Sequence, residues 1–181
     1  MKQHVCNARF AFAMYHSFRK HLQDPAAILG EYVMPGATVI DLGCGPGYFT
    51  IPIALLTGAS GTVFAVDIQE GMLRKMEERA VQAGVRTRVR PVLCTPGDIA
   101  VREPSDFVLS FWMAHEVPDR AALFSQIAAV MKPDARYLLV EPKFHVRKKR
   151  YGRIIGAAVA AGLKPLHEVP VPLSRAMLFG L

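Results

Sequence analysis

An apolar run in this chain ends in an acid and then in a loop with alternating glycines. The segment VIDLGCGPGYFT places Asp41 before Gly43, Gly45 and Gly47. Glycine lets the backbone approach a ligand closely, so such a loop between a strand and a helix predicts a nucleotide-type ligand. The dinucleotide fingerprint G-x-G-x-x-G would need a glycine where Tyr48 stands, and the P-loop pattern fails because no Lys-Ser/Thr pair follows.

The acids of this region separate the remaining ligand classes. A carboxylate at Asp41 would repel a pyrophosphate, whereas S-adenosylmethionine carries a cationic ammonium and sulfonium and no phosphate. Asp67 ends the next apolar run, twenty positions after Gly47, the offset expected of an acid that accepts from both hydroxyls of a ribose. Ile68 would then cover the adenine. Asp67 alone could be an ordinary helix N-cap, but with the glycine loop it predicts a two-point site for S-adenosylmethionine.

Candidate acid–base residues lie beyond the later apolar runs and near the N-terminus. These candidates are Tyr15, His16, His115, Glu116, Glu141 and His145. A histidine is a credible general base when the methyl acceptor must lose a proton. The alternative for His115 and Glu116 is a structural role in the turn to the next helix. Phe111 and Trp112 could wall an apolar acceptor or belong to the core.

Strand-like and helix-like patterns alternate along the chain. Strands are predicted at 37–42, 62–67, 88–94, 106–111 and 135–141, with a closing pair at 163–169 and 175–181. Helices are predicted at 48–56, from 72 to near Gly84, at 119–131 with Asp119 as N-cap, and at 148–161. This alternation predicts an α/β fold with a mostly parallel sheet, whose ligands bind at the carboxyl ends of the strands.

The residues before the first strand form a separate region. The apolar spacing in 10–22 and the pair Asp24-Pro25, typical of an N-cap and first helical turn, predict two helices. They would either lie across the ligand edge as a lid or pack against the edge of the sheet. We therefore expect one domain with an N-terminal helical cap, 1–33, and a cofactor-binding core, 34–181.

Composition indicates a globular protein in a reducing compartment. The chain has 181 residues, of which 51% are hydrophobic and 20% charged. No apolar run approaches the ~20 residues that span a bilayer and no signal peptide is evident, so a cytoplasmic location is expected. The cysteines Cys6, Cys44 and Cys94 are scattered, which argues against a disulfide framework and against a metal site.

The net charge of +7 permits an anionic partner. Part of this charge lies in the run RKKR at Arg147–Arg150. A run of this length at a helix start is more often a solvated face, so nucleic acid is possible as a partner but not favoured.

Together the motifs resemble those of class I S-adenosylmethionine-dependent methyltransferases of the small methyltransferase-domain type. VIDLGCGPG is similar to the family's first motif, VFAVDIQEGML to its second, and SDFVLSFWMAHEVPD and MKPDARYLLVEP to the fourth- and fifth-strand regions. The resemblance covers roughly residues 27–181. It implies a three-layer Rossmann-like fold with a seven-stranded sheet whose last strand is antiparallel, and relatives that act on quinones or metalloids.

The resemblance also implies the cofactor contacts. The set is Asp41, Gly43, Gly45 and Gly47 around the methionine part, Asp67 and Ile68 at ribose and adenine, and the backbone carbonyls of Ser110 and Phe111 at the ammonium. The family often places an acid directly after the third strand. Here the segment is LCTPGDIA, so Thr95, the later Asp98 or the backbone would take the adenine contact.

These inferences predict in-line methyl transfer from S-adenosylmethionine to a small-molecule acceptor, with S-adenosylhomocysteine as product, by a monomer or homodimer. The predicted catalytic residues are His115, Glu141, His145 and Tyr15. One alternative is an RNA methyltransferase that uses Arg147–Arg150. A less favoured one is a nicotinamide-dependent oxidoreductase or a non-catalytic nucleotide-binding module. A metalloid acceptor would need several thiolates, and Cys6 and Cys94 lie far apart in the sequence.

Overall fold

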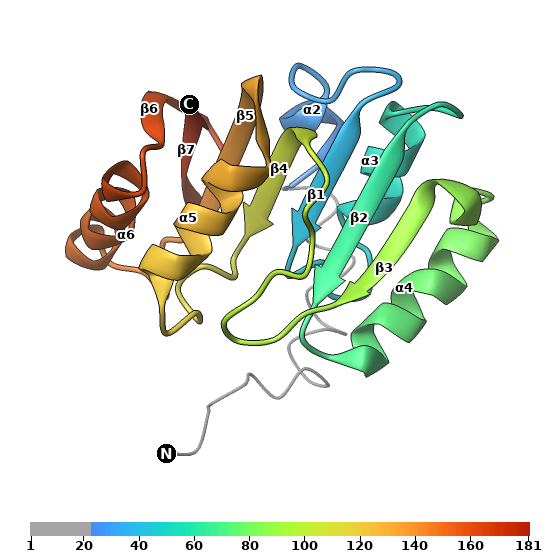
Figure 1. Cartoon of the computed structure of the whole chain (residues 1–181), viewed down its shortest axis with the longest axis horizontal. Coiled ribbons are helices and arrows are strands. Elements are labelled where there is room, and N and C mark those ends of the chain that lie inside the picture. The colour runs from blue at the N-terminus through green and yellow to red at the C-terminus, as the bar shows by residue number, and fades with distance from the viewer. Residues whose placement is uncertain (1–22) are drawn as a thin grey trace.

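A computed structural model describes residues 23–181 of the chain (Figure 1). The predicted helix at 10–22 and the candidate residues Tyr15, His16 and Cys6 lie outside the described residues. The predicted lid is therefore described only from its last few residues onward.

The second N-terminal helix begins where the sequence predicts. It is α2 (Pro25–Leu29), and Asp24 caps it by accepting a hydrogen bond from Ala26 N at 3.0 Å. Pro25 occupies the first helical turn, where its missing N–H costs nothing. The helix is short, and its buried residues Ile28 and Leu29 attach this segment to the core.

Within residues 23–181, one seven-stranded sheet runs through the molecule in the order β3-β2-β1-β4-β5-β7-β6 (Figure 1). Its strands are β1 (Thr38–Leu42), β2 (Thr62–Asp67), β3 (Val89–Leu93), β4 (Ser105–Phe111), β5 (Met131–Pro142), β6 (Lys164–Glu168) and β7 (Ser174–Gly180). Strands β1 to β5 pair in parallel, and β7 runs antiparallel to both β5 and β6. The predicted α/β class, with a mostly parallel sheet and an antiparallel last strand, is confirmed.

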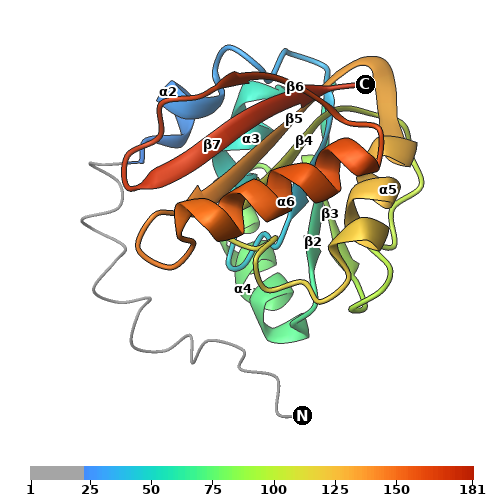
Figure 2. The same ribbon diagram turned by 90° about the vertical axis from the view of Figure 1, so that its left-hand side faces the viewer.

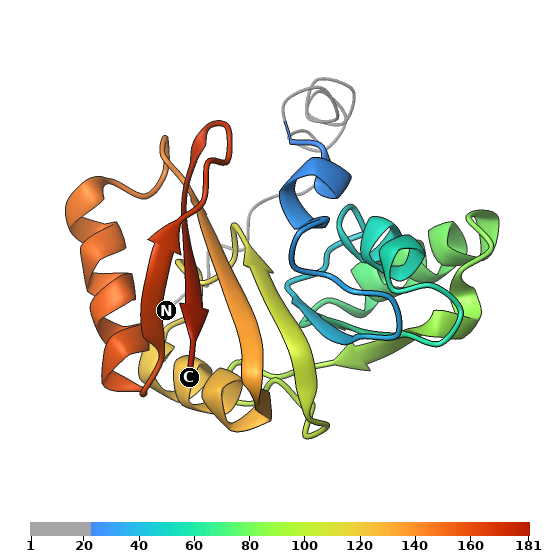
Figure 3. The same cartoon turned by 90° about the horizontal axis from the view of Figure 1, so that it is seen from above.

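Helices cover both faces of this sheet (Figure 3). They are α3 (Thr50–Leu56), α4 (Glu70–Gln82), α5 (Arg120–Val130) and α6 (Lys148–Ala160), with a short 3-10 turn, η1 (Arg86–Arg88). Alternate residues of β1 show the layering, because Val39 belongs to the same core cluster as Ile53 of α3, while Ile40 belongs to the cluster that contains Phe124 of α5. Helices α2, α3 and α4 therefore lie on one face, and α5 and α6 on the other.

Several element boundaries differ from the predicted ones by one or more residues, and two of these differences have a clear cause in the structure. Helix α3 begins at Thr50 rather than at Tyr48, because the turns of the glycine loop continue through residues 48 and 49 and Phe49 is the cap residue. Strand β5 begins at Met131 rather than at 135, because Met131 pairs with Ser105 before the register shifts.

The strand order creates a crevice at one edge of the sheet. The chain passes from β1 to β2 on one side, whereas β4 lies against the other side of β1. Connections that leave the carboxyl ends of β1 and β4 therefore diverge, and such a switch point is where open α/β sheets bind ligands. The glycine loop after β1 and the segment after β4 both begin at this edge.

Candidate functional site

The glycine loop between β1 and α3 is fastened to the end of β2. Gly43 N and Cys44 N both donate to Val66 O, at 2.8 and 3.0 Å. Gly45 N donates to Asp67 Oδ2 at 2.8 Å. The loop that would hold a cofactor is thus fixed by hydrogen bonds to the strand that carries Asp67.

The loop glycines differ in what surrounds them. All three, Gly43, Gly45 and Gly47, have positive φ, at +69°, +53° and +85°, a region that residues with a Cβ disfavour. A Cβ at Gly43 would lie 2.8 Å from Met113 Cβ, and one at Gly47 would lie 2.8 Å from Met76 Cγ. A Cβ at Gly45 would meet nothing within 4 Å. Gly43 and Gly47 therefore allow close packing, whereas Gly45 leaves the loop surface open.

Asp67 lies at the carboxyl end of β2 and is 7% exposed. Besides the bond from Gly45, its Oδ1 accepts from Gln69 N at 2.9 Å. A carboxylate has about four acceptor positions, so each oxygen retains one for a ligand hydroxyl. The N-cap alternative is only partly realised, because α4 begins at Glu70 with Gln69 as its cap residue.

A cavity of about 260 Å³ opens at the crevice beside Asp67. It is lined by residues 42–43, 66–69, 94–99, 111–113, 116–118, 123 and 126. Among the predicted cofactor residues, those in its lining are Gly43, Asp67, Ile68, Thr95, Asp98 and Phe111. Those outside its lining are Asp41, Gly45, Gly47 and Ser110. The structure thus gathers the ribose–adenine part of the predicted site around one cavity.

The polar groups of Asp41 and Ser110 lie beneath the crevice. Asp41 is 2% exposed and its Oδ2 accepts from Thr50 Oγ1 at 2.6 Å, which ties β1 to the start of α3. Ser110 is fully buried, and its hydroxyl lies 2.6 Å from Tyr137 Oη. Direct contact of these residues with a cofactor stays a prediction, and both have an evident structural task.

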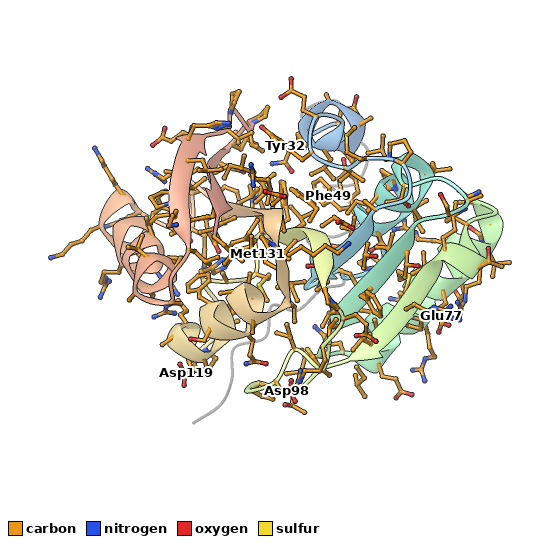
Figure 4. The ribbon with its side chains drawn as sticks, turned by 45° about the horizontal axis from the view of Figure 1, so that its top comes forward. Tyr32, Phe49, Glu77, Asp98, Asp119 and Met131 are labelled. Carbon is orange, nitrogen blue, oxygen red and sulfur yellow. The ribbon has the colours of Figure 1, made fainter. Side chains whose placement is uncertain are left out.

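The segment after β3, where the sequence departs from the family pattern, closes into a tight turn. Thr95 N donates to Asp98 O and Asp98 N to Thr95 O, at 3.0 and 3.3 Å. The Asp98 carboxylate accepts from Arg102 at 2.8 Å and from Ala100 N at 2.8 Å. The Arg102 hydrogen bond, followed by that from Ala100, lowers the pKa of Asp98. Asp98 lies on this loop at the same edge of the molecule as Asp119, the cap of α5 (Figure 4).

Sequence reasoning missed Gln126, which joins this turn to α5. Gln126 Oε1 accepts from Ile99 N at 3.0 Å and its Nε2 donates to Gly97 O at 3.0 Å. It also lines the cavity. The available signal was a long polar side chain in the apolar helical run RAALFSQIAAV.

Three of the predicted catalytic residues come together at the ends of β4 and β5. His115 Nδ1 lies 2.5 Å from Glu141 Oε2, and His115 N donates to Glu141 Oε1 at 3.1 Å. Glu141 is fully buried and His115 is 6% exposed. The ring of His145, which is exposed, lies 4.9 Å from that of His115, centroid to centroid. The buried carboxylate thus fixes the orientation of the His115 ring.

The other nitrogen of His115 lies near one residue of the cavity lining, although His115, Glu141 and His145 are not themselves in that lining. Its Nε2 lies 3.9 Å from Oε1 of Glu116, and Glu116 is exposed and lines the cavity. On the opposite side, Arg150 of α6 donates to His115 O at 2.8 Å and holds the backbone in place. His115 can therefore shape the turn through its backbone and still have a chemical role through its ring.

Aromatic rings line the route from the glycine loop to the loop between β5 and α6. Phe49 and Phe111 are 4.2 Å apart between ring centroids, Phe111 and Trp112 5.5 Å, and Trp112 and Phe144 5.5 Å. Trp112 has a φ of +62°, and its Nε1 donates to Ser174 Oγ at 2.9 Å. A bulky residue in the left-handed region is an outlier, and it marks the end of β4 as a specialised position.

The cysteines near the cavity do not form an activated thiolate. Burial, and then the carboxylates of Asp41 and Asp67, raise the pKa of the Cys44 thiol far above its ordinary value. Burial and then Asp67 also raise the pKa of Cys94. Among residues 23–181, no group of three or more His, Cys, Asp or Glu side chains is arranged to hold a metal ion.

Comparison with known families identifies the fold and its class. Residues 34–163 match a family model described as a methyltransferase domain. The chain belongs to this family. The predicted class of S-adenosylmethionine-dependent methyltransferase is thereby confirmed, and the cofactor prediction is supported.

Individual relatives agree with this assignment. Nocamycin O-methyltransferase of Saccharothrix syringae is 30% identical over 154 residues, which are 81% of this chain and 55% of that protein. A ubiquinone biosynthesis O-methyltransferase of Methylobacterium sp. (strain 4-46) is 27% identical over 179 residues, 95% of this chain and 69% of that protein. The chain thus spans only about half the length of some of the methyltransferases it matches.

Solved structures confirm the fold of this methyltransferase domain. A SAM-dependent methyltransferase from Aquifex aeolicus superposes with a TM-score of 0.80 at 23% identity, covering 89% of this chain and 91% of that one. A TehB-like methyltransferase from Corynebacterium glutamicum gives a TM-score of 0.71 at 16% identity, covering 92% and 96%. Within residues 23–181, no helix is both long and apolar enough to cross a membrane.

Proposed function

We propose that this methyltransferase-domain protein transfers a methyl group from S-adenosylmethionine to an apolar, ring-bearing small molecule. The observation that carries the proposal is the cavity at the β1–β4 switch point, with Asp67 in its wall and the glycine loop fastened beside it. Its relatives include enzymes named for nocamycin, ubiquinone and demethylmenaquinone, which supports a small-molecule acceptor.

The residues at the cavity fit the cofactor. Asp67 has acceptor positions left for the two ribose hydroxyls, and Ile68, 45% exposed, offers an apolar face to adenine. The open surface at Gly45 leaves room for the methionine part to approach the backbone. When bound, S-adenosylmethionine supplies an electrophilic methyl group on a sulfonium, so no metal is needed in the proposal.

His115 is proposed as the general base, with Glu141 as the residue that positions it. An ionised carboxylate only accepts hydrogen bonds, so Glu141 keeps the proton of the neutral imidazole on Nδ1. Nε2 is then left to take a proton from the methyl acceptor, on the side where Glu116 lines the cavity. His145 is proposed to flank the acceptor, and a catalytic role of Tyr15 stays a prediction outside the described residues.

The aromatic rings are proposed to select the acceptor. Phe111 and Trp112 line the cavity, and Phe144 extends this wall outward. Aromatic side chains hold a planar ring by offset or edge-on contacts, each worth about 0.5–1.5 kcal/mol beyond the buried area. Holding the nucleophile in line with the methyl group is itself a large part of such catalysis.

The other functions considered are not retained. The methyltransferase-domain match leaves no support for a nicotinamide-dependent oxidoreductase or a non-catalytic module. An RNA acceptor is not favoured, because the relatives described above are named for small-molecule products or substrates. A cytoplasmic location and a monomeric or homodimeric state remain predictions.

Transfer of labelled methyl from S-adenosylmethionine into a fractionated cell extract tests this proposal. We expect the label in the apolar small-molecule fraction, and only with active protein. A His115→Gln variant should bind S-adenosylhomocysteine as the wild type does but leave the fraction unlabelled. Label that enters only RNA or protein would contradict the proposal.

A further inference from the structure

Two exposed apolar side chains lie on adjoining loops near the acceptor end of the molecule. Phe144, in the loop between β5 and α6, is 64% exposed, and Leu173, just before β7, is 45% exposed. Lys143 N donates to Leu173 O at 2.9 Å, which holds the two loops together. Both loops project from the same end of the molecule (Figure 2).

Cationic residues flank Phe144 in the sequence, one directly before it and three within the five positions after it. Lys143, Arg147, Lys148 and Lys149 are all exposed. Within residues 23–181, none of them has a carboxylate at ion-pair distance. We define Phe144, Leu173 and these four cations as the basic–aromatic surface.

The neighbouring arginines behave differently. Arg150 donates to His115 O and Arg175 to Val146 O, each at 2.8 Å. These two guanidinium groups fasten the loop from within, whereas the side chains of the four cations of the basic–aromatic surface form no hydrogen bond or ion pair with residues 23–181. Most of the charge in the run RKKR is therefore available to a partner.

We propose that the chain docks on anionic lipid bilayers through the basic–aromatic surface. A solvated face would explain the lysines alone, whereas basic side chains combined with an exposed ring and leucine on adjoining loops are typical of a membrane-surface contact. At an anionic bilayer the cations meet the headgroups, and the ring enters the interface, where aromatic side chains are favoured. Each Lys or Arg near such a surface strengthens binding by about fivefold.

The placement of this surface gives the docking a consequence for the site. Phe144 contacts Trp112 edge-on at 5.5 Å, and Trp112 lines the cavity. A bilayer seated on Phe144 would therefore adjoin the acceptor side of the cavity. An apolar acceptor dissolved in that bilayer would then reach the cavity without crossing bulk water. Docking itself requires neither the cofactor nor methyl transfer, so it can fail while the proposed function holds.

Co-sedimentation of the full chain with vesicles tests the inference. We expect binding to phosphatidylcholine vesicles that contain about one quarter phosphatidylglycerol, little binding to pure phosphatidylcholine, and release at high salt. The variant Lys148→Gln/Lys149→Gln should bind about tenfold or more weakly. Phe144→Ser should weaken binding to the anionic vesicles without changing the cation count.

The matched control removes the same charge elsewhere. Lys75 on α4 and Arg90 on β3 are exposed and belong to the opposite half of the sheet. Lys75→Gln/Arg90→Gln should bind vesicles nearly as the wild type does, and every variant should still bind S-adenosylhomocysteine. Equal losses in control and test variants, or no binding to anionic vesicles, would overturn the inference. So would binding to a single-stranded RNA oligonucleotide in the absence of vesicle binding.

Discussion

The two halves of the crevice are built in different ways. On the β1–β2 side, the glycine loop is fixed by backbone groups, to Val66 O and to the Asp67 carboxylate. On the β4–β5 side, the features are side chains, namely the His115–Glu141 pair and the rings of Trp112 and Phe144. Both halves join segments that are distant in the sequence, but the first does so mainly through backbone groups and the second through side chains.

This difference matches the two tasks of a methyltransferase domain. A cofactor shared by the whole family is held by features that any member can keep, a loop and one acid. An acceptor that differs between enzymes needs side chains that can change without altering the backbone. One fold supports different functions through different site residues, so we expect the acceptor half to determine this protein's acceptor specificity.

The largest expected effect is a loss of methyl transfer from a substitution in the acceptor half alone. His115→Gln should lower the rate of methyl transfer by about 10²–10⁴-fold, the usual contribution of a general base, while leaving S-adenosylhomocysteine affinity unchanged. His167→Gln is the control, because His167 is an exposed histidine on β6 and is not in the cavity lining. A loss of cofactor affinity in His115→Gln would mean that the two halves are not separable.

The second prediction concerns the packing of the glycine loop in the cofactor half. Gly43→Ala should destabilise folding by roughly 2–4 kcal/mol, from left-handed strain and from the clash with Met113. Gly45→Ala should cost only the strain, about 1–2 kcal/mol, because its Cβ meets nothing. Urea unfolding of both variants measures the difference. Gly45→Ala should nevertheless weaken cofactor binding, and equal stability losses at both positions would refute the distinction.

The third prediction concerns the acid of the cofactor half. Asp67→Ala should weaken S-adenosylhomocysteine binding by about 1.5–3 kcal/mol, the range for hydrogen bonds to a charged group. Calorimetric titration measures this loss. The matched control is Asp98→Ala, which alters another acid in the cavity lining whose carboxylate already accepts from Arg102 and Ala100 N. Similar losses in both variants would show that Asp67 has no special contact.

The smallest expected effect is a pH dependence at the edge of the cofactor half. The pKa of Asp98 is lowered in the folded protein by its Arg102 hydrogen bond, so the pair stabilises the fold above the ordinary aspartate pKa of about 4. That contribution is lost as the pH falls through the lowered folded-state pKa. Because the group is exposed, Asp98→Asn should change only slightly the slope of melting temperature against pH below about pH 4. A large change in this slope would contradict the weak, solvent-exposed contribution expected of the Asp98–Arg102 pair.

The sequence was sufficient where neighbouring residues set the structure. The strand–glycine-loop–helix unit, Asp67 at a strand end and the caps Asp24 and Asp119 all follow from local patterns, and the structure has each of them. The start of α3 was wrong by two residues, because the turns of the glycine loop continue through residues 48 and 49.

The sequence was insufficient where distant residues meet. His115 and Glu141 were both candidates, but their 2.5 Å contact spans 26 positions and depends on the pairing of β4 with β5. Gln126 was missed because its partners Gly97 and Ile99 lie in a turn whose geometry no local pattern fixes. The apolar pair Phe144 and Leu173 likewise becomes a surface only once β7 lies beside β5.

Ligand-induced stabilisation tests the central claim most directly. At a hundredfold excess over its Kd, S-adenosylhomocysteine should stabilise the wild-type chain by about 2.7 kcal/mol, a rise in melting temperature of roughly 5–10 °C. At that same ligand concentration the rise should be smaller for Asp67→Ala, and NAD should produce none. A rise with NAD but not with S-adenosylhomocysteine, or no rise with either, would contradict the account.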